Sequence, residues 1–153
     1  MSFDVNSFLG GSIAEPISDK APTVPKGRWL CRIAELDGKE VSSWIKPPTG
    51  NATSPRLDVP VVILDESVMR EMGRTKPPTF TQGYFLNIDS ANPARIDSKN
   101  NSQFGELLAS LRVTGSTNGE LFSKLPGAGP FYATFAPDKK DDTRMRIVKT
   151  EAA

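Results

Sequence analysis

The sequence SQFGELLASLRV at residues 102–113 shows the clearest helical pattern in the chain. Its apolar side chains recur at i, i+3, i+4 and i+7 and so share one stripe of an α-helix; they are Phe104, Leu107, Leu108 and Leu111. Asn101 or Ser102 can cap the amino end, because a short polar side chain there accepts a hydrogen bond from an unpaired backbone N–H group. Gly115 is the expected stop. The pattern predicts one amphipathic helix that packs on a core.

Strand-like runs lie on both sides of this helix, three before it and two after it. Apolar side chains alternate with polar ones in these runs, as in half-buried strands. The runs cover residues 28–36, 56–64, 79–88, 131–136 and 143–149. The order β-β-β-α-β-β predicts a mostly β protein. We expect an OB-like five-stranded barrel with one main helix between the third and fourth strands.

Prolines and glycines divide the chain into three parts. Pro16, Pro22 and Pro25 disfavour regular structure near the amino terminus, so residues 1–26 are expected to form an extended arm. Four apolar residues of this arm form a hook that could dock on the body or on a neighbouring copy; they are Phe3, Val5, Phe8 and Leu9. The OB-like domain is expected at residues 27–150, with a short tail at residues 151–153.

The composition argues against several classes of function. The chain has no histidine, the commonest general base and metal ligand at neutral pH, and a single cysteine, Cys31, which excludes a Cys-rich zinc site. We therefore expect no catalytic residue, no metal, no cofactor and no small-molecule substrate, and we expect that the protein is not an enzyme. No apolar run is long enough to span a membrane, and residues 1–11 do not resemble a signal peptide, so we expect a soluble, intracellular protein.

The distribution of basic and aromatic residues favours binding of single-stranded nucleic acid. Such binding needs cations along a groove and flat side chains on which bases stack. Candidates occupy outward positions of the first, fourth and fifth strands and the loops that flank them: Arg28, Arg32, Trp44, Lys46, Tyr132, Lys139, Lys140, Arg144 and Arg146. Trp44 is expected to be exposed, because its loop has little apolar sequence around it. The alternative is that the arginines belong to the solvated face of a sheet and that Trp44 is core.

Several stretches also resemble bacteriophage early proteins that bind single-stranded DNA through an OB fold. The similar stretches are PKGRWLCRIAEL at residues 25–36, GYFLNID at residues 83–89, the Lys99–Asn100 pair and FGELLASLRV at residues 104–113. The resemblance implies sequence-independent binding of single-stranded DNA in phage replication or recombination, in the cytoplasm of an infected host cell. The alternative is a phage structural or assembly protein that forms homo-oligomers through its amino-terminal arm.

Overall fold

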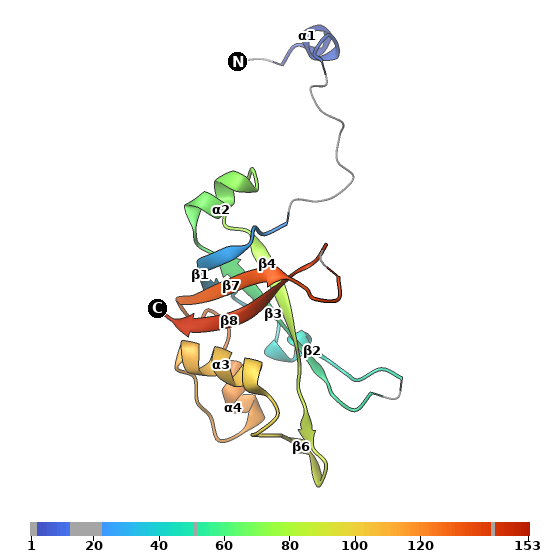
Figure 1. Ribbon diagram of the computed structural model, residues 1–153, viewed down its shortest axis with the longest axis vertical. Coiled ribbons are helices and arrows are strands. Elements are labelled where there is room, and N and C mark those ends of the chain that lie inside the picture. The colour runs from blue at the N-terminus through green and yellow to red at the C-terminus, as the bar shows by residue number, and fades with distance from the viewer. Residues whose placement is uncertain (1–2, 13–22, 51, 142) are drawn as a thin grey trace.

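The computed structural model describes residues 3–12, 23–50, 52–141 and 143–153. A six-stranded antiparallel sheet forms the body of the described chain (Figure 1). Its strands are β1 (Gly27–Ile33), β2 (Ile45–Lys46), β3 (Arg56–Ile63), β4 (Thr79–Phe85), β7 (Phe131–Pro137) and β8 (Met145–Ala152). A separate hairpin consists of β5 (Ile88–Asp89) and β6 (Asn92–Ile96). The helices are α1 (Val5–Leu9), the 3-10 helix η1 (Val41–Trp44), α2 (Glu66–Glu71), α3 (Ser102–Leu111) and α4 (Asn118–Ser123). The predicted mostly β class is confirmed.

The sheet follows the order β2-β3-β1-β7-β8. β2 and β1 pair with the two ends of one edge of β3, and β4 pairs along the opposite edge. β1 therefore lies between β3 and β7, and β4 and β8 are the outermost long strands. All pairings between these strands are antiparallel. Among the described residues, no ladder joins β4 to β8, so the closed barrel expected from the strand order is not found.

Side chains bridge the open seam between β4 and β8. Gln82 of β4 is buried, and its Oε1 accepts a hydrogen bond from the backbone N–H of Ile147 in β8 at 2.8 Å. Its Nε2 donates to the carbonyl of Gly83 at 3.1 Å. Further along β8, the N–H of Thr150 donates to Oε1 of Glu106 in α3 at 2.7 Å. Two backbone donors on the free edge of β8 are thus satisfied without a neighbouring strand.

The predicted main helix is present as α3, and its apolar stripe faces the core. Phe104 and Leu107 are buried, while Leu108 and Leu111 are half-buried against the core cluster. The helix ends at Leu111 with Arg112 in a left-handed conformation (φ 57°), before the expected stop at Gly115. The Asn101 side chain makes no capping bond to α3. It bonds instead to both backbone groups of Asn87 and to the carbonyl of Asp97, and so fixes the turn that leads into the helix.

Several boundaries differ from the sequence-based expectation. The third strand ends at Phe85 rather than at residue 88, and the chain between it and α3 contains the β5–β6 hairpin. β8 extends to Ala152, so the expected tail at residues 151–153 belongs largely to the sheet. Val24 is buried in the core, so the body begins before residue 27.

The segment of the arm at residues 3–12 contains the short helix α1 and no buried residue. Its large apolar side chains are exposed: Phe3 by 72%, Val5 by 57%, Phe8 by 67% and Leu9 by 73%. The expected extended course of residues 13–22, which include Pro16 and Pro22, lies outside the described residues.

Candidate nucleic-acid interface

A groove with a volume of about 670 Å³ runs between the outer face of β3–β4 and the β7–β8 hairpin. We call it the hairpin groove. Its sheet side is lined by Arg56, Asp58, Gly83 and Phe85, and its hairpin side by Asp138, Thr143, Arg144 and Arg146. The β7–β8 hairpin and the loop between β2 and β3 project on the same side of the molecule (Figure 1). The two loops therefore flank one stretch of the sheet; Lys46 lies in β2 just before one loop, and Lys139 and Lys140 lie in the other.

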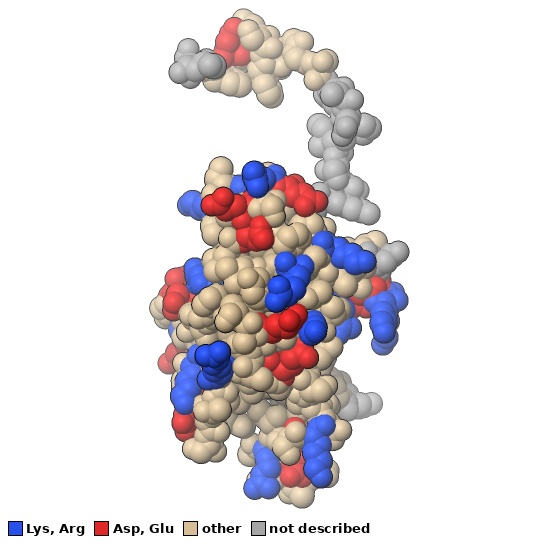
Figure 2. Space-filling model, turned by 60° about the vertical axis from the view of Figure 1, so that its left-hand side comes forward, with Lys and Arg blue, Asp and Glu red and all other residues tan. Residues whose placement is uncertain are grey.

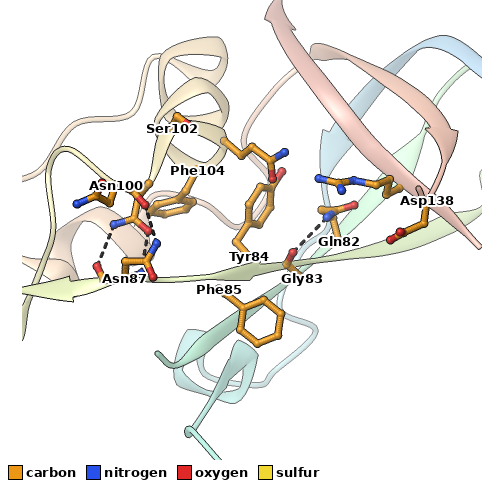
Figure 3. Close-up of a pocket in the computed structure, with 12 residues that line it drawn as sticks. Gln82, Gly83, Tyr84, Phe85, Asn87, Asn100, Ser102, Phe104 and Asp138 are labelled. Atoms are coloured by element: carbon orange, nitrogen blue, oxygen red, sulfur yellow. Dashed lines mark hydrogen bonds between the residues drawn. The ribbon is translucent and has the colours of Figure 1, made fainter. Parts of the chain in front are cut away.

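Phe85 places an aromatic ring on the outer face of β4. Successive side chains of a strand point to opposite faces, so Tyr84 enters the core and Phe85 faces solvent (Figure 3). Phe85 is 68% exposed and stands directly opposite Arg56 in the β3–β4 register. A flat, exposed ring beside a guanidinium group has the chemistry on which unpaired bases stack.

An ion pair and a glycine shape the sheet side of the groove. Nε and Nη2 of Arg56 lie 2.7 and 3.1 Å from the two carboxylate oxygens of Asp58, in a bidentate arrangement that orients the guanidinium. Gly83 lies opposite Asp58 in the register. A Cβ atom at Gly83 would lie 3.1 Å from Cδ of Arg56 and 3.2 Å from Oδ1 of Asp58. The glycine therefore gives the ion pair room to lie against β4.

The hairpin side of the groove carries charges of both signs. Arg144 and Arg146 provide the cations, and Asp138 and Asp141 shape the turn between the strands. The Asp138 carboxylate accepts from the N–H of Lys140 at 2.8 Å. The Asp141 carboxylate accepts from the hydroxyl and N–H of Thr143, and these bonds lower the pKa of Asp141. The carboxylates therefore hold the turn that presents the arginines and lysines.

The structure brings some of the predicted site residues together here. Arg144 and Arg146 line the hairpin groove, and Lys139 and Lys140 are exposed at the tip of the same hairpin. Lys46 is exposed in β2, where it pairs with Arg56 in the register, and its Nζ donates to the carbonyl of Ser43 at 3.2 Å.

Arg28, Arg32 and Tyr132 are neither in the lining of this groove nor in the loops beside it. Arg28 and Tyr132 pack together on the outer face of β1–β7–β8, where the Cζ atom of Arg28 lies 3.9 Å from the Tyr132 ring centroid. Nε of Arg28 lies 3.3 Å from Oε1 of Glu151, so the arginine is engaged on both sides. Arg32 is half-buried and donates to the carbonyl of Ile33. This arrangement agrees with the alternative interpretation, the solvated face of a sheet.

The expectation that Trp44 is exposed is wrong. Only 9% of Trp44 is exposed, and it belongs to the core cluster. The turn of η1 and the pairing of Ile45 with Leu57 direct it inward, although its stretch of sequence is short and polar. Trp29 is only half-buried, and its indole N–H donates to the carbonyl of Pro25 at 2.9 Å. Trp44 therefore cannot serve as a stacking surface.

A second hollow, of about 380 Å³, adjoins the hairpin groove at Phe85 and Arg146. Amide side chains line it, but several are already bonded. Asn87 donates to the carbonyl of Asn100 at 2.7 Å and accepts from the hydroxyl of Ser54 at 3.3 Å, for example. The bond from Asn87 to Asn100 fixes the turn before α3 (Figure 3). Phe85 and Arg56 were missing from the sequence-based candidates. The alternation of residues 80–88 was the available signal, since it places Phe85 on the face of Thr81 and Gly83.

Among the described residues, no group of three or more His, Cys, Asp or Glu residues could hold a metal ion. Within the same described ranges, no helix is long and apolar enough to cross a membrane. Burial raises the pKa of Cys31 to about 12, which keeps it a thiol rather than a reactive thiolate.

Comparisons of the chain with protein-family models, curated proteins and solved structures find no match. Basic and acidic side chains are interspersed on the face shown in Figure 2, without a continuous basic stripe. The case for a function therefore depends on the hairpin groove itself.

Proposed function

We propose that this protein binds single-stranded DNA, independently of sequence, in the hairpin groove. The observation that carries this proposal is the exposed ring of Phe85 beside Arg56, facing Arg144 and Arg146 across the groove. Stacking of a base on the ring requires an unpaired strand, and arginines can contact the phosphates on either side of it. A role in phage replication or recombination, implied by the sequence resemblance, is part of this proposal. No enzymatic step is part of it.

An OB-like architecture is part of this proposal, and it would favour the same location. The OB fold is a five-stranded, partly open barrel that binds oligonucleotides on its second and third strands, between the 1–2 and 4–5 loops. In the chain order β1, β3, β4, α3, β7, β8, the second and third long strands are β3 and β4. The hairpin groove lies on their outer face, and the β7–β8 hairpin forms one wall. The side-chain bridges across the β4–β8 seam are compatible with partial opening.

Fluorescence anisotropy with labelled oligo-dT and a duplex of equal length tests the proposal. We expect the wild type to bind oligo-dT more tightly than the duplex. Phe85→Ala should weaken oligo-dT binding roughly 5- to 150-fold, the equivalent of about 1–3 kcal/mol for one stacked base. Val148→Ala is the matched control, because Val148 is 42% exposed in β8 and does not line the groove. Equal affinity of Phe85→Ala and the wild type would reject the groove as the interface.

A structural or assembly protein is the second candidate, and the exposed apolar side chains of α1 favour it. Failure of the wild type to bind oligo-dT at low salt, together with self-association of the free protein, would support this candidate instead.

A further inference from the structure

A separate, apolar groove of about 370 Å³ lies between β2, the β5–β6 hairpin and α4. Its apolar lining includes Ile45, Leu86, Ile88, Ile96 and Phe122. Ile88 and Ile96 are opposite each other in the β5–β6 register, which fixes both on one face of the hairpin. The side chain of Asn118 in α4 donates to the carbonyl of Ala94 in β6 at 2.9 Å. This bond ties two walls of the groove together.

The helix α1 offers a complementary apolar surface. Its N-cap, Asp4, accepts from the N–H of Asn6 at 3.1 Å and the hydroxyl of Ser7 at 2.8 Å, so the turn is formed before any partner is bound. The rings of Phe3 and Phe8 pack at 5.3 Å between centroids. Large apolar side chains clustered in this way are unfavourable in water and typically mark an interaction site.

We propose that α1 of one copy docks in the apolar groove of a second copy. The described chain enters the body at the end that carries α2, whereas β2, β6 and α4 form the other end (Figure 1). The arm therefore joins the body at the end remote from the groove. In a neighbouring copy placed end to end, the groove lies close to this end.

Charge favours the same contact. Residues 1–22 contain three of the 18 acidic residues of the chain but only one of its 19 basic residues. Asp4 lies in the docking helix itself. Arg95 lines the apolar groove with 69% of its side chain exposed, and its ion pair with Asp89 spans 3.9 Å. A carboxylate arriving with α1 therefore meets an accessible guanidinium beside the apolar surface.

The contact is heterologous, because it joins two different surfaces. Contacts of this type form rings when the geometry closes and open chains when it does not. The inference does not depend on nucleic-acid binding, and its test uses the free protein.

Sedimentation velocity of the full chain over a concentration series tests the proposal. We expect concentration-dependent self-association of the wild type. Phe8→Ser combined with Leu9→Ser, in the exposed arm, should weaken it by at least about tenfold, because each side chain loses apolar burial. Ala94→Arg, at an exposed position that lines the groove, should weaken it similarly by filling the groove. Ala91→Arg is the matched control, on the same hairpin but outside the lining, and should associate like the wild type.

Mixing the two defective variants gives the decisive measurement. The arm variant retains an intact groove, and Ala94→Arg retains an intact arm, so an equimolar mixture should form a 1:1 complex at concentrations at which neither variant associates alone. A monomeric wild type at the highest attainable concentration would overturn the proposal. Unchanged association of Ala94→Arg, or no complex in the mixture, would also overturn it, since either would place the contact elsewhere.

Discussion

Trp44 reaches the core through a single turn of 3-10 helix. Glu40 is the residue before η1, and the hydroxyl and N–H of Ser43 bond to its backbone carbonyl at 2.7 and 3.0 Å. The turn places the indole of Trp44 in the hydrophobic core, while the side chains of Ser42 and Ser43 stay exposed. The environment of one aromatic residue is thus decided by the direction of a short turn rather than by its polar neighbours.

Replacing Trp44 tests this burial directly. Trp44→Ala should lower the free energy of unfolding by roughly 3–5 kcal/mol, the usual range when a large buried aromatic side chain is removed. Denaturant unfolding followed by circular dichroism measures the change. Trp29→Phe serves as the comparison, because Trp29 is only half-buried and the change retains an aromatic ring. A Trp44→Ala variant as stable as the wild type would show that the indole is not part of the core.

At the scale of elements, α2 shows how one carboxylate sets a helix boundary and its pH dependence. The Asp65 carboxylate accepts from the hydroxyl and N–H of Ser67, which holds the pKa of Asp65 below its usual value. Because the folded-state pKa is depressed, the stabilisation is complete above the unfolded-state pKa. It is lost as the pH falls through the folded-state value.

Asp65→Ala should therefore lower the free energy of unfolding at pH 7 by roughly 0.5–2 kcal/mol, the usual range for loss of an N-cap. The difference from the wild type should shrink as the pH falls below the ordinary aspartate value of 3.8. Asp65→Asn retains an acceptor and should lose less stability at neutral pH. Denaturant titrations at several pH values provide the measurement; a constant difference across the series would contradict the role of the charged cap.

The β4–β8 seam depends on another side chain, Gln82. Gln82→Leu would remove the acceptor of the Ile147 N–H, so the free energy of unfolding should fall by roughly 1–3 kcal/mol. Amide hydrogen exchange of Ile147 should accelerate more than that of Ala133, which lies on β7 within the sheet. If exchange at Ile147 remained as slow as in the wild type, the side-chain bridge would not be what protects this strand edge.

Elements with a strong periodic pattern could be predicted from the sequence. The stripe of α3 and the alternation of β3 both depend on residues that one shared core buries. The β5–β6 hairpin could not be predicted in this way, because its strands are short, most of its residues are exposed, and its apolar residues do not alternate regularly with polar ones. The candidate site was predicted in part. Its hairpin arginines follow from strand alternation, whereas Arg56 and Phe85 come together only through the β3–β4 register.

At the scale of the whole molecule, the formal net charge is only +1, so general attraction to a polyanion is weak. Any nucleic-acid affinity must come from local placement of cations. In the hairpin groove these are Arg56, Arg144 and Arg146, and the first of them is already paired with Asp58. We therefore expect a modest salt dependence, set by a few phosphate contacts rather than by the surface as a whole.

This expectation can be measured as the slope of log K against log salt concentration for oligo-dT. Each phosphate contact on a single strand contributes a slope of about −0.7, so three contacts give about −2. Arg144→Ala combined with Arg146→Ala should reduce the slope by about 1.4 and weaken binding. Arg70→Ala combined with Arg74→Ala removes the same charge from positions outside the groove, and should leave the slope unchanged. If both double variants changed the slope equally, overall charge rather than the hairpin groove would govern binding, and the proposed interface would be rejected.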